Sequence, residues 1–181
     1  MAKWNIDPDH AVAEFIAKHM MVTPVHGQLN KVSGTIIFDP ESPANASVEV
    51  EIDVTGLYTG VDRRDNHLRS PHFFDVEKFP KMYFKSTLIE VDSLNRCKVT
   101  GDLTIHGITR SVMFDVTFAG PSRFFDDEQN QMYTTFGFRA TTCINREDYG
   151  LKWNVAIEDG GFMVSKYVDI IFNAEADLVN E

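Results

Sequence analysis

SVEVEIDV, residues 47–54, is an almost unbroken alternation of apolar and acidic side chains. Valine or isoleucine stands at every second position from 48 to 54, and glutamate or aspartate fills the positions between. Successive side chains of a β-strand point to opposite faces, so this pattern predicts a strand with one buried and one solvated face. One-sided burial of this kind is typical of an antiparallel sheet.

The same alternation recurs on both sides of this stretch, and it predicts an all-β fold. Upstream, Ala13, Phe15, Ala17 and His19 share one face. Downstream, alternating runs cover residues 83–91, 97–105, 111–118, 132–144 and 167–178. Gly107 falls between two of these runs, which indicates a β-hairpin. Residues 125–131 are polar and are expected to form a loop.

About eight long strands in near-sequential order favour one extended eight-stranded antiparallel β-barrel, because closure removes exposed sheet edges. A β-sandwich is the alternative architecture. One or two short helices are expected, the first over residues 64–70 with Asp62 as its N-cap and Pro71 as its stop. A second helical turn is expected at 75–80. The whole chain, residues 1–181, is predicted to be a single domain.

The interior of such a barrel is either solid or open. The chain has 14 Phe but only 2 Trp and 5 Tyr, so it needs a large apolar interior. Large and small side chains can interdigitate into a filled core. Alternatively, small residues facing large ones leave a lumen that holds one ligand, as eight-stranded barrels can.

RDNHLRSPHFFD, residues 64–75, interrupts the strand pattern with charge, histidine and paired phenylalanines. His67 near Asp65 could act as a general base. An Asp65–Arg69 pair across one helical turn, with Leu68, Phe73 and Phe74 closing one barrel end, is the structural alternative. A metal site from Asp65, His67 and His72 lacks the usual ligand spacing.

Two further groups are candidates for the mouth of a pocket. His19 is a lone histidine on an otherwise apolar face, where it is either a hydrogen-bonded core residue or a contact for a ligand head group. Arg146 follows the strand at 132–144, and Trp153 lies shortly after it. They form either a rim ion pair with a packed tryptophan or part of the pocket lining.

Composition and missing motifs exclude several function classes. The formal net charge of −10 disfavours nucleic acid as a partner. No apolar run approaches the roughly 18 residues that span a bilayer, so stable membrane insertion is not expected. Phosphate-binding loops, nucleophile elbows and metalloprotease motifs are absent, so we predict no enzyme, no catalytic residue, no metal and no cofactor. The sequence as given has no leader, which predicts a cytoplasmic location, or a periplasmic one if a leader was removed.

Taken together, the motifs resemble the YceI-like family of polyisoprenoid-binding, lipocalin-like proteins. Phe15, Lys18-His19, and Gly27 before Leu29 contribute to the match. The longer motifs are WNIDPDH (4–10), GTIIFDP (34–40), TGVDRRDNHLRSPHFFDVEKFP (59–80), GDLTIHGITRSV (101–112) and INREDYGLKW (144–153). Each is weak alone, but their order along nearly the whole chain is specific.

The resemblance implies a long barrel that holds an elongated isoprenoid lipid or isoprenoid quinone in its lumen, for carriage, storage or sequestration. With the inward faces it predicts the ligand-contacting residues: Phe15, Ala17, His19, Phe38, Val50, Ile52, His67, Leu68, Phe73, Phe84, Leu103, Phe114, Val116, Phe138, Ile144, Arg146, Trp153, Ile170 and Phe172. A polar head group would lie near His67, Arg146 or His19. A lipid-modifying enzyme using His67 and Asp65, and a stress-related structural module without a ligand, are the alternatives. A homodimer through exposed barrel surface is a further expectation.

Overall fold

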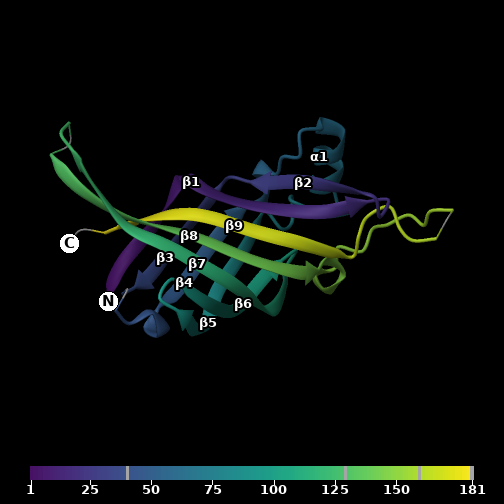
Figure 1. The fold of residues 1–181 in the computed structure, drawn as a ribbon. Helices are drawn as coiled ribbons and strands as arrows, with labels where there is room; N and C mark the ends of the chain where they lie inside the picture. The colour runs from purple at the N-terminus through teal and green to yellow at the C-terminus, as the bar shows by residue number, and fades with distance from the viewer. Residues whose placement is uncertain (40, 129, 159, 180–181) are drawn as a thin grey trace.

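An antiparallel sheet closes on itself in the computed structural model, which describes residues 1–39, 41–128, 130–158 and 160–179. Its strands are β1 Ala2–His19, β2 Thr23–Leu29, β3 Val32–Phe38, β4 Ser47–Asp53, β5 Lys81–Ser93, β6 Arg96–Ile105, β7 Ile108–Asp126, β8 Gln131–Asn145 and β9 Tyr167–Leu178. They follow one another in the order β2-β1-β3-β4-β5-β6-β7-β8-β9, and β1 also pairs with β9. That last pairing closes the ring into a barrel (Figure 1).

Strands β2 and β3 share one place in the wall. The C-terminal half of β1 pairs with β2, from Ala13↔Leu29 to His19↔Thr23, and its N-terminal end pairs with β3, from Ala2↔Phe38. The ring therefore has eight strand positions, all antiparallel, although the sheet has nine strands. This confirms the predicted eight-stranded, lipocalin-like antiparallel barrel and rules out the sandwich.

Helical structure is short, as predicted. The α-helix α1 spans Asp62–Arg69, and single 3-10 turns occupy Pro43–Asn45 (η1), Val54–Gly56 (η2) and Arg146–Tyr149 (η3). The expected N-cap at Asp62 is wrong. Val61 holds that position without a side-chain cap, and Asp62 begins the helix, where its negative charge faces the positive end of the helix dipole. Within the described residues, no helix is long and apolar enough to cross a membrane.

The two ends of the barrel differ (Figure 1). Helix α1 and the long segment between η3 and β9 lie at one end, and the start of β1, the end of β9 and the β7–β8 hairpin lie at the other. The loop expected over residues 125–131 is shorter than predicted, because β7 continues to Asp126 and β8 begins at Gln131. Pro40, which ends the GTIIFDP motif, and the last two residues of the predicted 1–181 domain lie outside the described residues.

Candidate functional site

A cavity of about 210 Å³ occupies the barrel lumen. Most of the predicted ligand-contacting residues line it: Phe15, Ala17, Val50, Ile52, Leu68, Phe73, Phe84, Leu103, Phe114, Val116, Phe138, Ile144, Arg146, Ile170 and Phe172. The remaining lining residues were not among the predicted ligand contacts: Ile6, Ala13, Glu14, Leu29, Ile36, Val48, Phe74, Met82, Val99, Ile105, Ala140, Leu151, Val164 and Val168. Apart from Glu14 and Arg146, every lining residue is apolar.

The alternating sequence places these side chains inside, and two glycines give the largest of them room. The ring of Phe15 lies over Gly27, its partner on β2, so close that a Cβ at Gly27 would sit 2.1 Å from the ring. Gly101 accommodates the ring of Phe84 in the same way, since a Cβ at Gly101 would sit 2.5 Å from that ring. These rings therefore tilt into recesses of the wall, which leaves space along the lumen.

An aromatic cluster closes the end of the lumen that lies opposite α1. The ring of Phe136 contacts Trp4 and Phe38 edge to face, with centroids 5.1 and 5.3 Å away, and Phe38 also meets Phe118 and Phe138. The Trp4 indole N–H donates to the Phe38 carbonyl at 3.2 Å. The structure therefore places Phe38 in this plug and not in the cavity lining where it was predicted, because neighbouring rings cover it.

The other end of the lumen is covered by α1 and the turns after it. Leu68, Phe73 and Phe74 reach into the cavity from this segment. The Arg69 guanidinium fixes the helix to the rim by donating to the backbone carbonyls of Thr55 (3.1 Å) and Leu57. The expected Asp65–Arg69 pair is therefore wrong, because Arg69 is used by these carbonyls.

His67 and Trp153 lie above the cavity and do not line it. His67 Nε2 and His72 Nδ1 are 3.0 Å apart, and the Trp153 ring lies 4.6 Å from the His67 ring and 5.3 Å from that of Phe73. Burial, and then the nearby charge of His72, lower the pKa of His67. His67 and Trp153 thus belong to a cluster of rings with His72 and Phe73, and the spacing of the sequence could not separate this cluster from the lining.

The histidine–carboxylate pair considered for catalysis does not form. The buried Asp65 carboxylate accepts the backbone N–H of Thr59 at 2.9 Å and also its hydroxyl, so it holds the loop before α1. Asp65 therefore joins neither His67 in a catalytic pair nor the two histidines in a metal site. Asp7, His10 and Glu175 do bring their ligand atoms within 4.8 Å of one another, but outside the lumen and largely exposed.

His19 is exposed and does not line the cavity. It is the last residue of β1, where the strand leaves the covered wall and bridges Val164. Alternation placed it correctly on the face shared with Ala17, but the sequence does not show where the wall ends.

Arg146 continues the inward series of β8 beyond Ile144 and is 4 % exposed. Its Nε donates to the Ser165 carbonyl at 2.9 Å, Nη2 to the Val164 carbonyl at 3.3 Å, and Nη1 to the Leu151 carbonyl. These bonds hold the segment between η3 and β9 over the lumen. Burial lowers the pKa of Arg146. The expected rim ion pair does not involve Arg146: among the described residues, the ion pair of this segment joins Glu147 and Lys166 at 3.4 Å.

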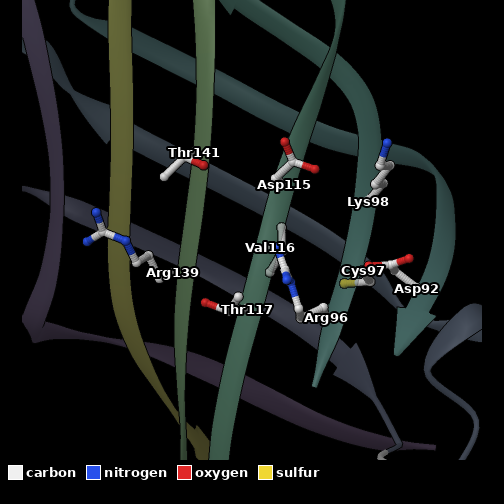
Figure 2. A pocket seen from close by; sticks show the side chains of 9 residues that line it. All are labelled: Asp92, Arg96, Cys97, Lys98, Asp115, Val116, Thr117, Arg139 and Thr141. Atoms are coloured by element: carbon white, nitrogen blue, oxygen red, sulfur yellow. The ribbon is translucent and has the colours of Figure 1, made fainter. Parts of the chain in front are cut away.

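A second hollow of about 160 Å³ lies on the wall formed by β5, β6, β7 and β8 (Figure 2). It is lined by Asp92, Arg96, Cys97, Lys98, Asp115, Val116, Thr117, Arg139 and Thr141. Five of these side chains are charged. The strand alternation turns the charged ones on β6, β7 and β8 away from the lumen, whereas Val116 also lines the lumen cavity. Such a surface does not suit an apolar chain, so the lumen is the candidate site for an apolar ligand.

A closed barrel of eight strand positions around an apolar lumen defines a lipocalin-like protein. Within that class, the chain belongs to the YceI-like domain family, whose model matches residues 4–176. It is 36% identical over 177 residues to a UPF0312 protein of Staphylococcus aureus (strain bovine RF122 / ET3-1), covering 98% of this chain and 97% of that one.

Solved structures agree on the fold. The crystal structure of BcnA from Burkholderia cenocepacia superposes with a TM-score of 0.78 at 25% identity, covering 94% of this chain and 98% of that one. A Campylobacter jejuni YCEI protein matches with a TM-score of 0.70 at 26% identity, covering 91% and 90% of the two chains. A polyisoprenoid binding domain from Saccharophagus degradans, 14% identical, covers 99% of this chain with a TM-score of 0.68 and shows the shared fold.

Proposed function

We propose that this barrel binds an elongated apolar lipid, a polyisoprenoid or an isoprenoid quinone, in its lumen, for carriage, storage or sequestration. One observation carries the proposal: the cavity runs from Ile36 and Val48 near the aromatic plug to Leu68 and Leu151 under α1, and nearly all of its lining is apolar. A chain of isoprene units needs apolar contact area along its length and no hydrogen bonds. The polyisoprenoid binding of the Saccharophagus degradans domain, which shares the fold, supports the same ligand class.

The size of the cavity adds a condition to this proposal. A cavity of roughly 150 Å³ lined by aliphatic and aromatic groups suffices for one benzene molecule. At about 210 Å³, the lumen as it stands takes a short apolar segment. Rings such as Phe114 and Phe172 bound the space, and side chains can change rotamer more readily than a strand can move. A long tail is therefore accommodated by rotation of these rings.

Burial supplies the affinity. Removing apolar surface from water contributes about 25 cal/mol per Å², and ordering a flexible tail offsets part of that gain. The catalytic pair considered for the lipid-modifying alternative does not form, because Asp65 is bonded to Thr59 and not to His67. The lipid-modifying alternative therefore has no structural support, and a solid structural module does not agree with the cavity.

Filling the lumen tests the proposal. Ala140 lines the cavity, whereas its neighbour Thr141 lines the outer hollow, so Ala140→Phe and Thr141→Phe form a matched pair on opposite faces of β8. We expect Ala140→Phe to weaken binding of geranylgeraniol, measured by calorimetry, by at least about 10-fold, and Thr141→Phe to leave it unchanged. Equal effects of both substitutions would place the lipid outside the lumen, and no binding to the unmodified protein would refute the proposal.

A further inference from the structure

Arg146 is a buried cation in a cavity that otherwise has almost no polar group. Its side chain lines the lumen and is 4 % exposed. A charge taken out of water is costly unless it is paired with an opposite charge. Within the part of the chain that the structure describes, no carboxylate lies within ion-pairing distance of its guanidinium. The adjacent Glu147 is paired with Lys166 at 3.4 Å, on the outside.

The guanidinium also has unused donors. An arginine carries five N–H groups. Nε, Nη1 and Nη2 each donate one hydrogen bond, to the carbonyls of Ser165, Leu151 and Val164. That leaves one N–H on each terminal nitrogen without an acceptor among the described residues. Two N–H groups on adjacent nitrogens match the two oxygens of a carboxylate or a phosphate.

Glu14, the other charged residue of the lining, does not neutralise Arg146. Its carboxylate accepts from the Asn173 side chain at 3.3 Å, and Asn173 in turn accepts from Arg139. This hydrogen-bond chain includes the exposed Arg139, so Glu14 is tied to the outer surface of the wall. Arg146 is thus left as the charged group that faces the apolar space.

We propose that the lipid carries an acidic head group, a carboxylate or a phosphate, which Arg146 binds at the α1 end of the lumen. This inference rests on the proposed function and adds the head-group class to it. The apolar tail then extends from Arg146 towards the aromatic plug around Phe136. The chain's net charge of −10 repels anions in general, so a preference for an acidic lipid must come from a local cation such as this one.

Three probes with one tail test the inference: geranylgeraniol, geranylgeranoic acid and geranylgeranyl phosphate. Calorimetry on the intact protein should show one or both acidic lipids binding about 10- to 100-fold more tightly than the alcohol, the size of a charged hydrogen bond. The acid and the phosphate arms distinguish the two head groups. The preference should persist in about 0.5 M NaCl, because salt screens buried charges weakly.

Two substitutions locate the preference. Arg146→Met should abolish it while the alcohol still binds, and Arg139→Met, which removes an exposed arginine from β8, should leave it intact. Loss of the preference in Arg139→Met but not in Arg146→Met overturns the proposal. So does equal affinity of the unmodified protein for all three probes, which leaves lipid binding itself standing. Binding of none of the three probes refutes the proposed function instead.

Arg146 also holds the segment above the lumen, so Arg146→Met could fail to fold. Thermal unfolding of each variant checks this. In that case, two other measurements show whether Arg146 causes the preference for acidic lipids. One uses Arg146→Lys, which keeps the charge but has fewer donors. The other compares the unmodified protein in low and high salt. A preference that disappears in high salt contradicts a buried anchor.

Discussion

Phe114 shows most directly, at the scale of single residues, which face of β7 points inward. It lines the cavity at 8 % exposure, with the Phe84 ring 5.2 Å away, whereas its neighbour Met113 is 43 % exposed. Phe114→Asp would bury an unpaired charge, so we expect it to lower the free energy of unfolding by about 3 kcal/mol or more. Met113→Asp should change it by less than about 0.5 kcal/mol. Urea denaturation measures both, and similar effects of the two would show that the assigned face is wrong.

Tyr149 offers a second test at this scale. It is 1 % exposed, and its hydroxyl has no hydrogen-bond partner among the described residues. Burial, followed by the charge of Asp148, raises the pKa of Tyr149 to about 12. A buried hydroxyl without a partner costs about 1–3 kcal/mol, so Tyr149→Phe should leave the free energy of unfolding unchanged or raise it by about 1 kcal/mol. If urea denaturation shows that Tyr149→Phe lowers the free energy of unfolding by more than about 1 kcal/mol, the hydroxyl has a hydrogen-bond partner.

Residue positions were predictable where they depend on alternation alone. Phe15, Val50 and Phe172 line the lumen because each stands at an inward position of its strand. Phe38 obeys the same rule yet lies in the plug, because neighbouring rings, which are distant in sequence, cover it. The hydrogen bonds between Asp65 and Thr59 likewise depend on the path of a loop. A loop has no repeating pattern of apolar and polar residues from which the direction of its side chains could be predicted.

At the scale of elements, the β1–β2 pair controls the width of the lumen through Gly27. The closest atoms to a Cβ at Gly27 all belong to the Phe15 ring, the nearest at 2.1 Å. Gly27→Ala therefore moves that ring into the cavity. We expect about 1–3 kcal/mol of destabilisation and weaker binding of geranylgeraniol, measured by denaturation and calorimetry. Unchanged affinity would mean that the Phe15 ring does not limit the lumen.

Helix α1 should make stability depend on pH through His67. Burial and the nearby charge of His72 lower the pKa of His67 from 6.5. The unfolded state then binds more protons than the folded state between the two pKa values, so stability falls as the pH drops through about 6.5 and stops falling below the folded pKa. Thermal unfolding at about pH 7.5 and pH 5.5 should show a smaller loss in His67→Gln than in the unmodified protein.

His26→Gln is the control for this prediction, because His26 is an exposed histidine that lies on β2 and not on α1. Between about pH 7.5 and pH 5.5, His26→Gln should lose as much stability as the unmodified protein. If His67→Gln and His26→Gln behave alike, the pH dependence arises elsewhere in the molecule.

Over the whole molecule, the barrel was predictable because closure follows from many long alternating strands in near-sequential order. The alternation could not show that β2 and β3 share one place in the wall, since that depends on pairing with two parts of β1. The sequence also did not show whether the lumen is open, because strands with the same apolar inward faces can enclose either a solid or a hollow interior. The recesses at Gly27 and Gly101, visible only in three dimensions, favour the hollow one.

The most direct test of lumen binding is native mass spectrometry of the protein as purified, repeated after organic extraction and after adding a polyprenol or an isoprenoid quinone. We expect a complex heavier than the 20.5 kDa chain, which extraction removes and at least one added lipid restores. Ala140→Phe, with its filled lumen, should not regain the complex. Finding only the mass of the chain in every preparation, with no uptake of either lipid, would show that the lumen does not bind these lipids.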